Sequence, residues 1–180
     1  MHDDIKQILL TKEEIDNRVV EMGKELTEAY KDKDVVVVVL LKGAAWFATD
    51  LTRAIDLPLR VAFMVASSYG NGTSTTGNVK VKLDLSEDIK GKDVLVIDDI
   101  NDSGVTFAAI SDMLRQYKPA SLKTAALCDK AERRVNGLQA DYVGFKIPEE
   151  FVVGYGLDYS GDYRNLPYIG VLKPSVYARK

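Results

Sequence analysis

The feature that most constrains the fold of this chain is an apolar run with no alternation. Residues 35–41 read VVVVVLL. Successive side chains of a strand point to opposite faces, so a strand with one wet face alternates polar and apolar residues. A strand that is covered on both faces needs no polar position, and this is typical of parallel sheets flanked by helices. We therefore predict that this run is a central strand, buried on both sides.

Helical and extended segments alternate through most of the chain. A helix is predicted over residues 11–30, where Thr11 and Glu14 fit a capping box. A further helix is predicted over residues 44–55, and strands over residues 59–65, 79–85, 93–98, 122–130, 141–147 and 151–156. In a helix predicted over residues 106–117, large side chains share one face: Phe107, Ile110, Leu114 and Tyr117. This order predicts an α/β fold, with a mainly parallel twisted sheet flanked by helices, as a single domain over residues 1–180.

Composition excludes several classes of protein. Lysine and arginine number 24 and aspartate and glutamate 27, so the net charge of −3 argues against nucleic-acid or anionic-membrane partners. The single cysteine, Cys128, cannot form an internal disulfide. No secretory signal is recognisable, and residues 35–41 are too short to span a bilayer, so a cytoplasmic protein is expected. His2 is the only histidine, which excludes a Ser-His-Asp relay and leaves Asp, Glu, Lys or Tyr as general base.

The most informative segment is VLVIDDINDSGVTF, residues 94–107. An apolar strand runs directly into carboxylates and then into a hydroxyl-rich turn before a helix. Ligands of parallel sheets bind beyond the carboxyl ends of the strands, and N–H groups at a helix start suit a phosphate. The adjacent carboxylates Asp98 and Asp99 could accept hydrogen bonds from a sugar diol or hold Mg²⁺. The ordinary alternative is a strand-to-helix turn capped by Asp and Ser.

Residues 66–78 form a long connection rich in Gly, Ser and Thr, with Tyr69 as its aromatic residue. Loops of this length are usually functional or disordered. Because strands are predicted on both sides, we expect the tip of a hairpin.

The string DDINDSGVT resembles the phosphoribosyl-diphosphate signature of the type I phosphoribosyltransferases, and neither a Walker motif nor G-x-G-x-x-G is present. The segments LLKGAAWFATDL, LCDKAERR and EEFVVGYGLDYSGDYRNLPYIGVLKP extend the resemblance, from about the first helix onward, to the bacterial hypoxanthine-guanine phosphoribosyltransferases. This resemblance implies the type I fold, with a small hood formed by the chain ends. It also implies Mg²⁺-dependent transfer of 5-phosphoribosyl from phosphoribosyl diphosphate to N9 of hypoxanthine or guanine, giving IMP or GMP.

The resemblance assigns roles to matching residues. Asp102 is the expected proton acceptor near purine N7, a role that a carboxylate can fill where no histidine is at hand. The metal is expected at Asp98, Asp99 and Asp158, and the peptide that precedes Lys42 is expected to be cis. Phosphoribosyl diphosphate is expected to bind Lys42, Gly43, Asp98, Asp99, Asp102, Ser103, Gly104, Val105, Thr106 and Arg164.

The same resemblance places a 6-oxopurine on a second group of residues: Lys130, Phe151, Val152 and Asp158. The ammonium of Lys130 has donors only, so it pairs with a 6-oxo group and not with the 6-amino group of adenine. Ser68 and Tyr69 match a lid that closes during reaction. A homodimer or homotetramer is also expected.

Two positions depart from the family pattern. The family usually has Glu at Asp98 and an apolar residue at Asn101, whose side chain could face ligand or solvent. Close alternatives are a relative that prefers xanthine and a non-catalytic, RNA-binding regulator with the same fold. The acidic balance opposes the regulator, and a dinucleotide-binding oxidoreductase lacks its glycine fingerprint.

Overall fold

A six-stranded sheet lies at the centre of the computed structural model, which describes residues 2–68, 79–83, 85 and 87–178. The strand order is β4-β3-β2-β5-β6-β7, with β4 antiparallel to β3 and the other neighbours parallel. The mainly parallel sheet that was predicted is therefore confirmed. Its strands are β2 (Val35–Leu41), β3 (Leu59–Ser68), β4 (Val79–Leu83), β5 (Asp93–Asn101), β6 (Ser121–Asp129) and β7 (Tyr142–Lys146).

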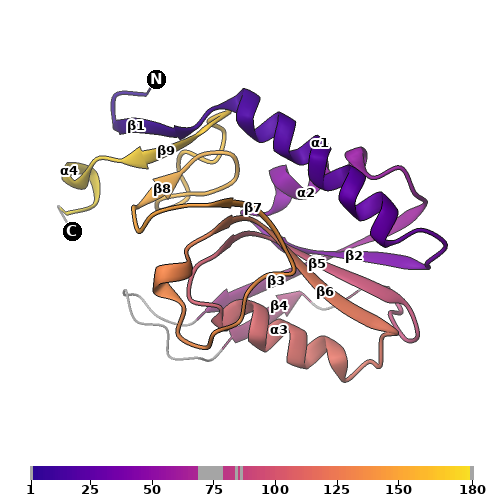
Figure 1. The fold of residues 1–180 in the computed structure, drawn as a ribbon. Coiled ribbons are helices and arrows are strands. Elements are labelled where there is room, and N and C mark those ends of the chain that lie inside the picture. The colour runs from indigo at the N-terminus through magenta and orange to yellow at the C-terminus, as the bar shows by residue number, and fades with distance from the viewer. Residues whose placement is uncertain (1, 69–78, 84, 86, 179–180) are drawn as a thin grey trace.

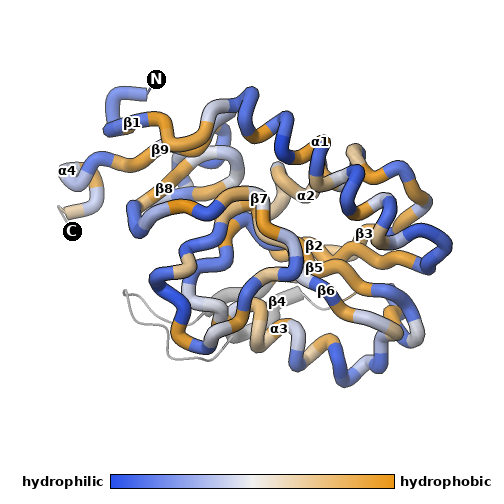
Figure 2. Tube along the Cα trace, in the orientation of Figure 1, coloured by the Kyte–Doolittle hydropathy of each residue, from blue (hydrophilic) through white to orange (hydrophobic). Residues whose placement is uncertain are grey.

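Helices cover both faces of this sheet (Figure 1). One face carries α1 (Lys12–Ala29) and α2 (Ala45–Ala54), and the other carries α3 (Val105–Arg115). The side chains of β2 divide between the two cores: Val35, Val37 and Val39 pack with α1 and α2, and Val36, Val38 and Leu40 pack with α3. Figure 2 shows the hydrophobic colour continuous along the central strands. The apolar run is thus a strand buried on both sides, as predicted.

The two ends of the chain meet in a second, antiparallel sheet (Figure 1). Its order is β1-β9-β8, from β1 (Ile5–Leu10), β9 (Ile169–Leu172) and β8 (Val152–Val153). A short helix, α4 (Pro174–Tyr177), follows β9. Ile5, Val153 and Leu172 form the small core of this sheet. This sheet is the hood expected from the resemblance, although β1 and β9 were not predicted as strands.

The predicted helix boundaries hold at α1 and fail at the end of α3. The capping box is present, since the Glu14 N–H donates to Thr11 Oγ1 at 3.2 Å and the Thr11 N–H donates to Glu14 Oε2 at 2.8 Å. The prediction that the helix reaches Tyr117, with this side chain on the face of Phe107, Ile110 and Leu114, was wrong, because α3 ends at Arg115 and Tyr117 is 43% exposed. Lys118 has a φ of 57° and precedes Pro119, a position that disfavours helix.

In the part of the chain that the structure describes, no helix has the length and apolarity to cross a membrane.

Two adjacent valines of α1 test the packing of this helix. Val19 is 4% exposed in the core and Val20 is 49% exposed. We expect Val19→Ala to lower the free energy of unfolding by about 2 kcal/mol, because two buried carbons and their contacts are lost. Val20→Ala is the control and should stay within about 0.5 kcal/mol of the wild type. Urea unfolding measures both, and equal losses would contradict this packing.

Candidate active site

The turn between β5 and α3 has a backbone geometry that suits an anion. β5 ends at Asn101, α3 begins at Val105, and Gly104 between them has a φ of 82°. That left-handed conformation favours glycine. The Ser103 Oγ accepts a hydrogen bond from the Val105 N–H at 3.4 Å. The first N–H groups of a helix lack intrahelical partners, so this turn, the phosphate turn Asp102–Gly104, can bind a phosphate group.

A cavity of about 440 Å³ opens at this edge of the sheet. Its walls come from the ends of β2 and β5, from the phosphate turn and from the hood. It brings together the residues predicted to bind phosphoribosyl diphosphate, with the exception of Val105: Lys42, Gly43, Asp98, Asp99, Asp102, Ser103, Gly104, Thr106 and Arg164. Val105 lies beside the cavity as the first residue of α3. Binding itself stays a prediction.

The segment after β2 comes very close to β5 and to the hood. The peptide between Leu41 and Lys42 is cis, as expected from the resemblance. A Cβ added at Gly43 would lie 1.6 Å from Asp99 Oδ2, and one added at Gly156 would lie 2.0 Å from the Gly43 oxygen. Both positions therefore need glycine. A side chain at Gly43 would displace Asp99, and a side chain at Gly156 would push the hood away from Gly43.

Asp98 and Asp99 are two adjacent, buried carboxyl groups at the end of β5. Burial raises the pKa of Asp98 well above its ordinary value, and the neighbouring Asp99 charge raises this pKa further. Burial also raises the pKa of Asp99, which the Arg164 charge partly opposes. The Asp99 N–H donates to Asp98 Oδ1 at 2.9 Å. A cation placed beside this pair would favour its ionised form.

The donor set at this edge fits Mg²⁺ in its usual mode. Mg²⁺ is commonly held by one or two carboxylates, waters and substrate phosphates, and Asp98 and Asp99 supply such a pair. Among the described residues, no group of three or more metal-ligating acidic, histidine or cysteine side chains is close enough to hold an ion. Asp158 is engaged otherwise, since Oδ1 lies 2.6 Å from Arg164 Nη2 and Oδ2 accepts from the Gly161 N–H at 2.7 Å. Its predicted role at the metal stays a prediction.

A second cavity of about 290 Å³ adjoins the first. The predicted purine residues all line it: Lys130, Phe151, Val152 and Asp158. Lys130 is only 7% exposed, and burial lowers the pKa of its ammonium, which the Asp102 charge partly opposes. Its Nζ donates to the Glu150 oxygen at 2.8 Å. An ammonium has three donors, so Lys130 can still donate to a ligand.

The Phe151 ring is backed by the C-terminal helix. It stacks on Tyr177 with ring centroids 5.1 Å apart and an interplanar angle of 25°, and Tyr159 meets it edge-on at 5.6 Å. Phe151 remains 39% exposed and faces the second cavity. A flat apolar ring held in this way suits stacking with a planar ligand.

Three residues that line the second cavity had no predicted role: Arg133, Ile100 and Leu157. Arg133 Nε lies 3.3 Å from Asp102 Oδ1 and 3.7 Å from Glu149 Oε1. The string DKAERR places Arg133 three residues after Lys130, and this spacing was the available signal. In the sequence, Ile100 and Leu157 look like ordinary core residues, so no sequence signal distinguishes them from residues that do not line the site.

The predicted lid lies mostly outside the described residues. Ser68 ends β3 and pairs with Val79 of β4, which confirms the expected hairpin. Tyr69 lies outside the described residues.

A larger cavity, of about 580 Å³, lies at the opposite edge of the sheet. Its walls are residues 32–35 and 57–60, around the amino ends of β2 and β3. Ligands of parallel sheets bind at the carboxyl ends, where the acidic and hydroxyl side chains gather. We therefore assign the site to the two smaller cavities.

Asp98→Asn should stabilise the ligand-free protein at alkaline pH. Because its pKa is raised, Asp98 favours folding in its protonated form. This contribution to the free energy of unfolding is fully present below the ordinary pKa of 3.8 and is lost as pH rises through the raised pKa. The variant cannot ionise, so the difference between thermal midpoints should grow in its favour from about pH 4 to about pH 8, by roughly 2–4 °C for each kcal/mol of repulsion removed. Asp56→Asn, at an exposed position, is the control. A wild type that is more stable than Asp98→Asn at about pH 8 would contradict this burial.

Comparisons with known proteins agree with this geometry. The family model of the phosphoribosyl transferase domain matches residues 7–160. A hypoxanthine-guanine phosphoribosyltransferase of Staphylococcus aureus is 51% identical over 178 residues, which cover 99% of each chain. A crystal structure of a hypoxanthine phosphoribosyltransferase from the same species superposes with a TM-score of 0.95, at 51% identity, over 98% of this chain and 96% of that one.

A longer relative contains the same region. The bifunctional protein TilS/HprT of Listeria innocua is 49% identical over 99% of this chain, and the matched region spans 28% of that protein. Sequence, fold and site therefore agree that this chain belongs to the phosphoribosyl transferase domain family, among the hypoxanthine-guanine phosphoribosyltransferases.

Proposed function

We propose that this chain transfers the 5-phosphoribosyl group of phosphoribosyl diphosphate to N9 of hypoxanthine or guanine in purine salvage. The bond from ribose C1 to a diphosphate oxygen breaks, the C1–N9 bond forms, and the purine loses a proton. The observation that carries this proposal is that the first and second cavities share one wall, which contains Asp99, Asp102 and Asp158. Two substrates can thus meet at the same carboxylates.

Asp102 is the proposed proton acceptor for the purine. Asp102 Oδ1 is buried and accepts no hydrogen bond from the described residues, although Arg133 Nε is 3.3 Å away. A buried acceptor without a hydrogen bond is costly unless a ligand completes it. A purine in the second cavity would supply the missing N–H at N7.

Lys130 and Phe151 are proposed to select the base. Lys130 would donate to the 6-oxo group, and the 6-amino group of adenine offers no acceptor there. Phe151 would stack on the purine, with Val152 at its edge in the same cavity. These contacts favour 6-oxopurines as a class, xanthine included.

The first cavity is proposed to hold the phosphoribosyl diphosphate. The phosphate turn would bind the 5-phosphate, and Lys42 and Arg164 would contact the diphosphate. Asp98 and Asp99 would hold Mg²⁺ together with the ribose hydroxyls. The ion would neutralise the charge of the leaving diphosphate. Ser68, at the end of β3, lies where the lid would begin.

Assembly and location remain proposals as well. We propose a homodimer or homotetramer in the cytoplasm. Val61 and Phe63 of β3 are 37% and 47% exposed, and this apolar surface is compatible with a contact between subunits.

Asp102→Asn should fold normally and lose most of its turnover. We expect kcat to fall about 10²- to 10⁴-fold, because general-base catalysis is removed while the shape of the side chain is kept. Steady-state rates with hypoxanthine check this, and the thermal midpoint checks the fold. Asp112→Asn, at an exposed position of α3, is the matched control. Unchanged turnover in Asp102→Asn would remove this carboxylate from the chemistry.

The defining experiment offers hypoxanthine, guanine, xanthine, adenine and uracil separately, with phosphoribosyl diphosphate and Mg²⁺. We expect nucleotide from hypoxanthine and guanine and none from adenine, because Lys130 has no acceptor to bind. Xanthine as the best substrate would assign the chain to the xanthine-preferring relatives. Folded protein that converts none of these bases would favour a regulator built on this fold.

A further inference from the structure

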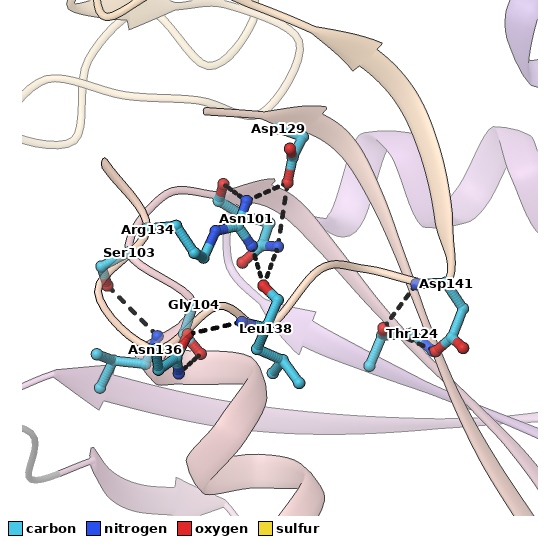
Figure 3. Close-up of polar contacts among 10 residues, drawn as sticks. Asn101, Ser103, Gly104, Thr124, Asp129, Arg134, Asn136, Leu138 and Asp141 are labelled. Carbon is cyan, nitrogen blue, oxygen red and sulfur yellow. Dashed lines mark hydrogen bonds and ion pairs between the residues drawn. The ribbon is translucent and has the colours of Figure 1, made fainter. Parts of the chain in front are cut away.

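The loop between β6 and β7 folds back over the phosphate turn (Figure 3). The Val135 N–H donates to the Ser103 oxygen at 3.1 Å. Asn136 Nδ2 donates to the Gly104 oxygen at 3.0 Å, and Asn136 Oδ1 accepts from the Leu138 N–H at 3.1 Å. Two successive carbonyls of the phosphate turn are therefore held from this one loop.

Packing between the loop and the turn leaves no space for a side chain on Gly104. A Cβ at Gly104 would lie 2.3 Å from Asn136 Oδ1 and 2.8 Å from Arg134 Cδ. The loop is thus packed directly against Gly104.

A buried network anchors the loop to the sheet. The Arg134 guanidinium pairs with Asp129 and donates to the Leu138 oxygen, and it reaches the Asn101 oxygen at 3.4 Å. The Arg134 and Asp129 side chains are 7% and 5% exposed. Hydrogen bonds to the rest of the protein make such a buried ion pair tolerable, and among the described residues only Nε of this guanidinium has no hydrogen-bond partner. Figure 3 shows Arg134 between these partners.

Asn101, the departure from the family pattern, belongs to this network. Its Nδ2 donates to Asp129 Oδ1 at 3.1 Å, and Asn101 is 2% exposed. Asn101 and Asp129 face each other across β5 and β6. Each directly precedes a residue of the proposed site, Asp102 or Lys130. Asn101 also lines the first cavity, so the anchor adjoins the proposed site.

We propose that Asn136 is a positioning residue that orients the phosphate turn for its ligand, with Arg134, Asp129 and Asn101 as its anchor. A peptide unit is planar, so holding a carbonyl fixes the direction of the N–H on the other side of the same unit. Holding the Ser103 and Gly104 oxygens therefore aims the N–H groups of Gly104 and Val105 away from the loop, to the side where the Val105 N–H meets Ser103 Oγ at 3.4 Å. The Ala108 N–H also donates to the Gly104 oxygen, at 3.1 Å, which sets the helical side of this arrangement.

The identity of the ligand, a ribose 5-phosphate group, rests on the proposed function. Asn136 itself is exposed, and its contacts are to the turn and to its own loop. Truncating it should therefore change ligand binding more than folding.

Asn136→Ala tests this role. We expect the KM for phosphoribosyl diphosphate to rise roughly three- to tenfold, the effect of one lost neutral hydrogen bond. The KM for hypoxanthine should stay within about twofold, because the second cavity does not contact Asn136. Asn17→Ala, at an exposed position of α1, is the matched control and should change neither value.

A binding readout separates orientation from catalysis. Ribose 5-phosphate carries the 5-phosphate and neither purine nor diphosphate. At one fixed concentration it should raise the thermal midpoint of wild type and Asn17→Ala, and raise that of Asn136→Ala less. The midpoints of the three ligand-free proteins should agree closely.

Several results would overturn the proposal. They are an unchanged KM for phosphoribosyl diphosphate, equal rises in both KM values, and equal stabilisation of Asn136→Ala and wild type by ribose 5-phosphate. A wild type that ribose 5-phosphate does not stabilise would overturn it too. If the wild type converts no base yet is stabilised by ribose 5-phosphate and Asn136→Ala is stabilised less, the proposed reaction fails while the positioning role stands.

Discussion

The structure depends on the burial of β2 and β5 between two layers of helices. Their apolar side chains fill both cores, so these strands can run only through the middle of the sheet. Since neighbouring strands are parallel, their carboxyl ends reach one common edge. Polar groups that could not be tolerated inside the sheet therefore gather at that edge. The acidic pair of β5 and the glycine turn after β2 meet there, with no space between Gly43 and Asp99.

Charge is then distributed so that two of the four acidic side chains that line the two cavities, Asp102 and Asp158, have a basic partner. Three arginines pair with three aspartates: Arg133 with Asp102, Arg134 with Asp129, and Arg164 with Asp158. Asp98 and Asp99 instead have pKa values raised by burial. A cation beside Asp98 and Asp99 would favour their ionised forms, whereas Asp102, Asp129 and Asp158 already have a positive charge beside them.

The parts predicted well from sequence are those whose signal is local. The apolar runs, the capping box at Thr11 and the acidic string after residue 97 depend on a few neighbouring residues. The strands β1 and β9 were not predicted, because they pair with each other from opposite ends of the chain. Tyr117 was misplaced because α3 ends before it, at Arg115. No role was predicted for Arg133, because only the folded loop brings this residue to Asp102.

By itself, the sequence determined the type of sheet, the position of the glycine- and hydroxyl-containing turn after β5 and the kinds of side chain around it. Hydrophobic pattern and turn chemistry act over a few residues, so they can be read along the chain. Only the tertiary structure decided that two cavities share one acidic wall, and that the loop after β6 holds the phosphate turn through Asn136. These contacts join residues far apart in the chain, and their geometry exists only when the layers are packed.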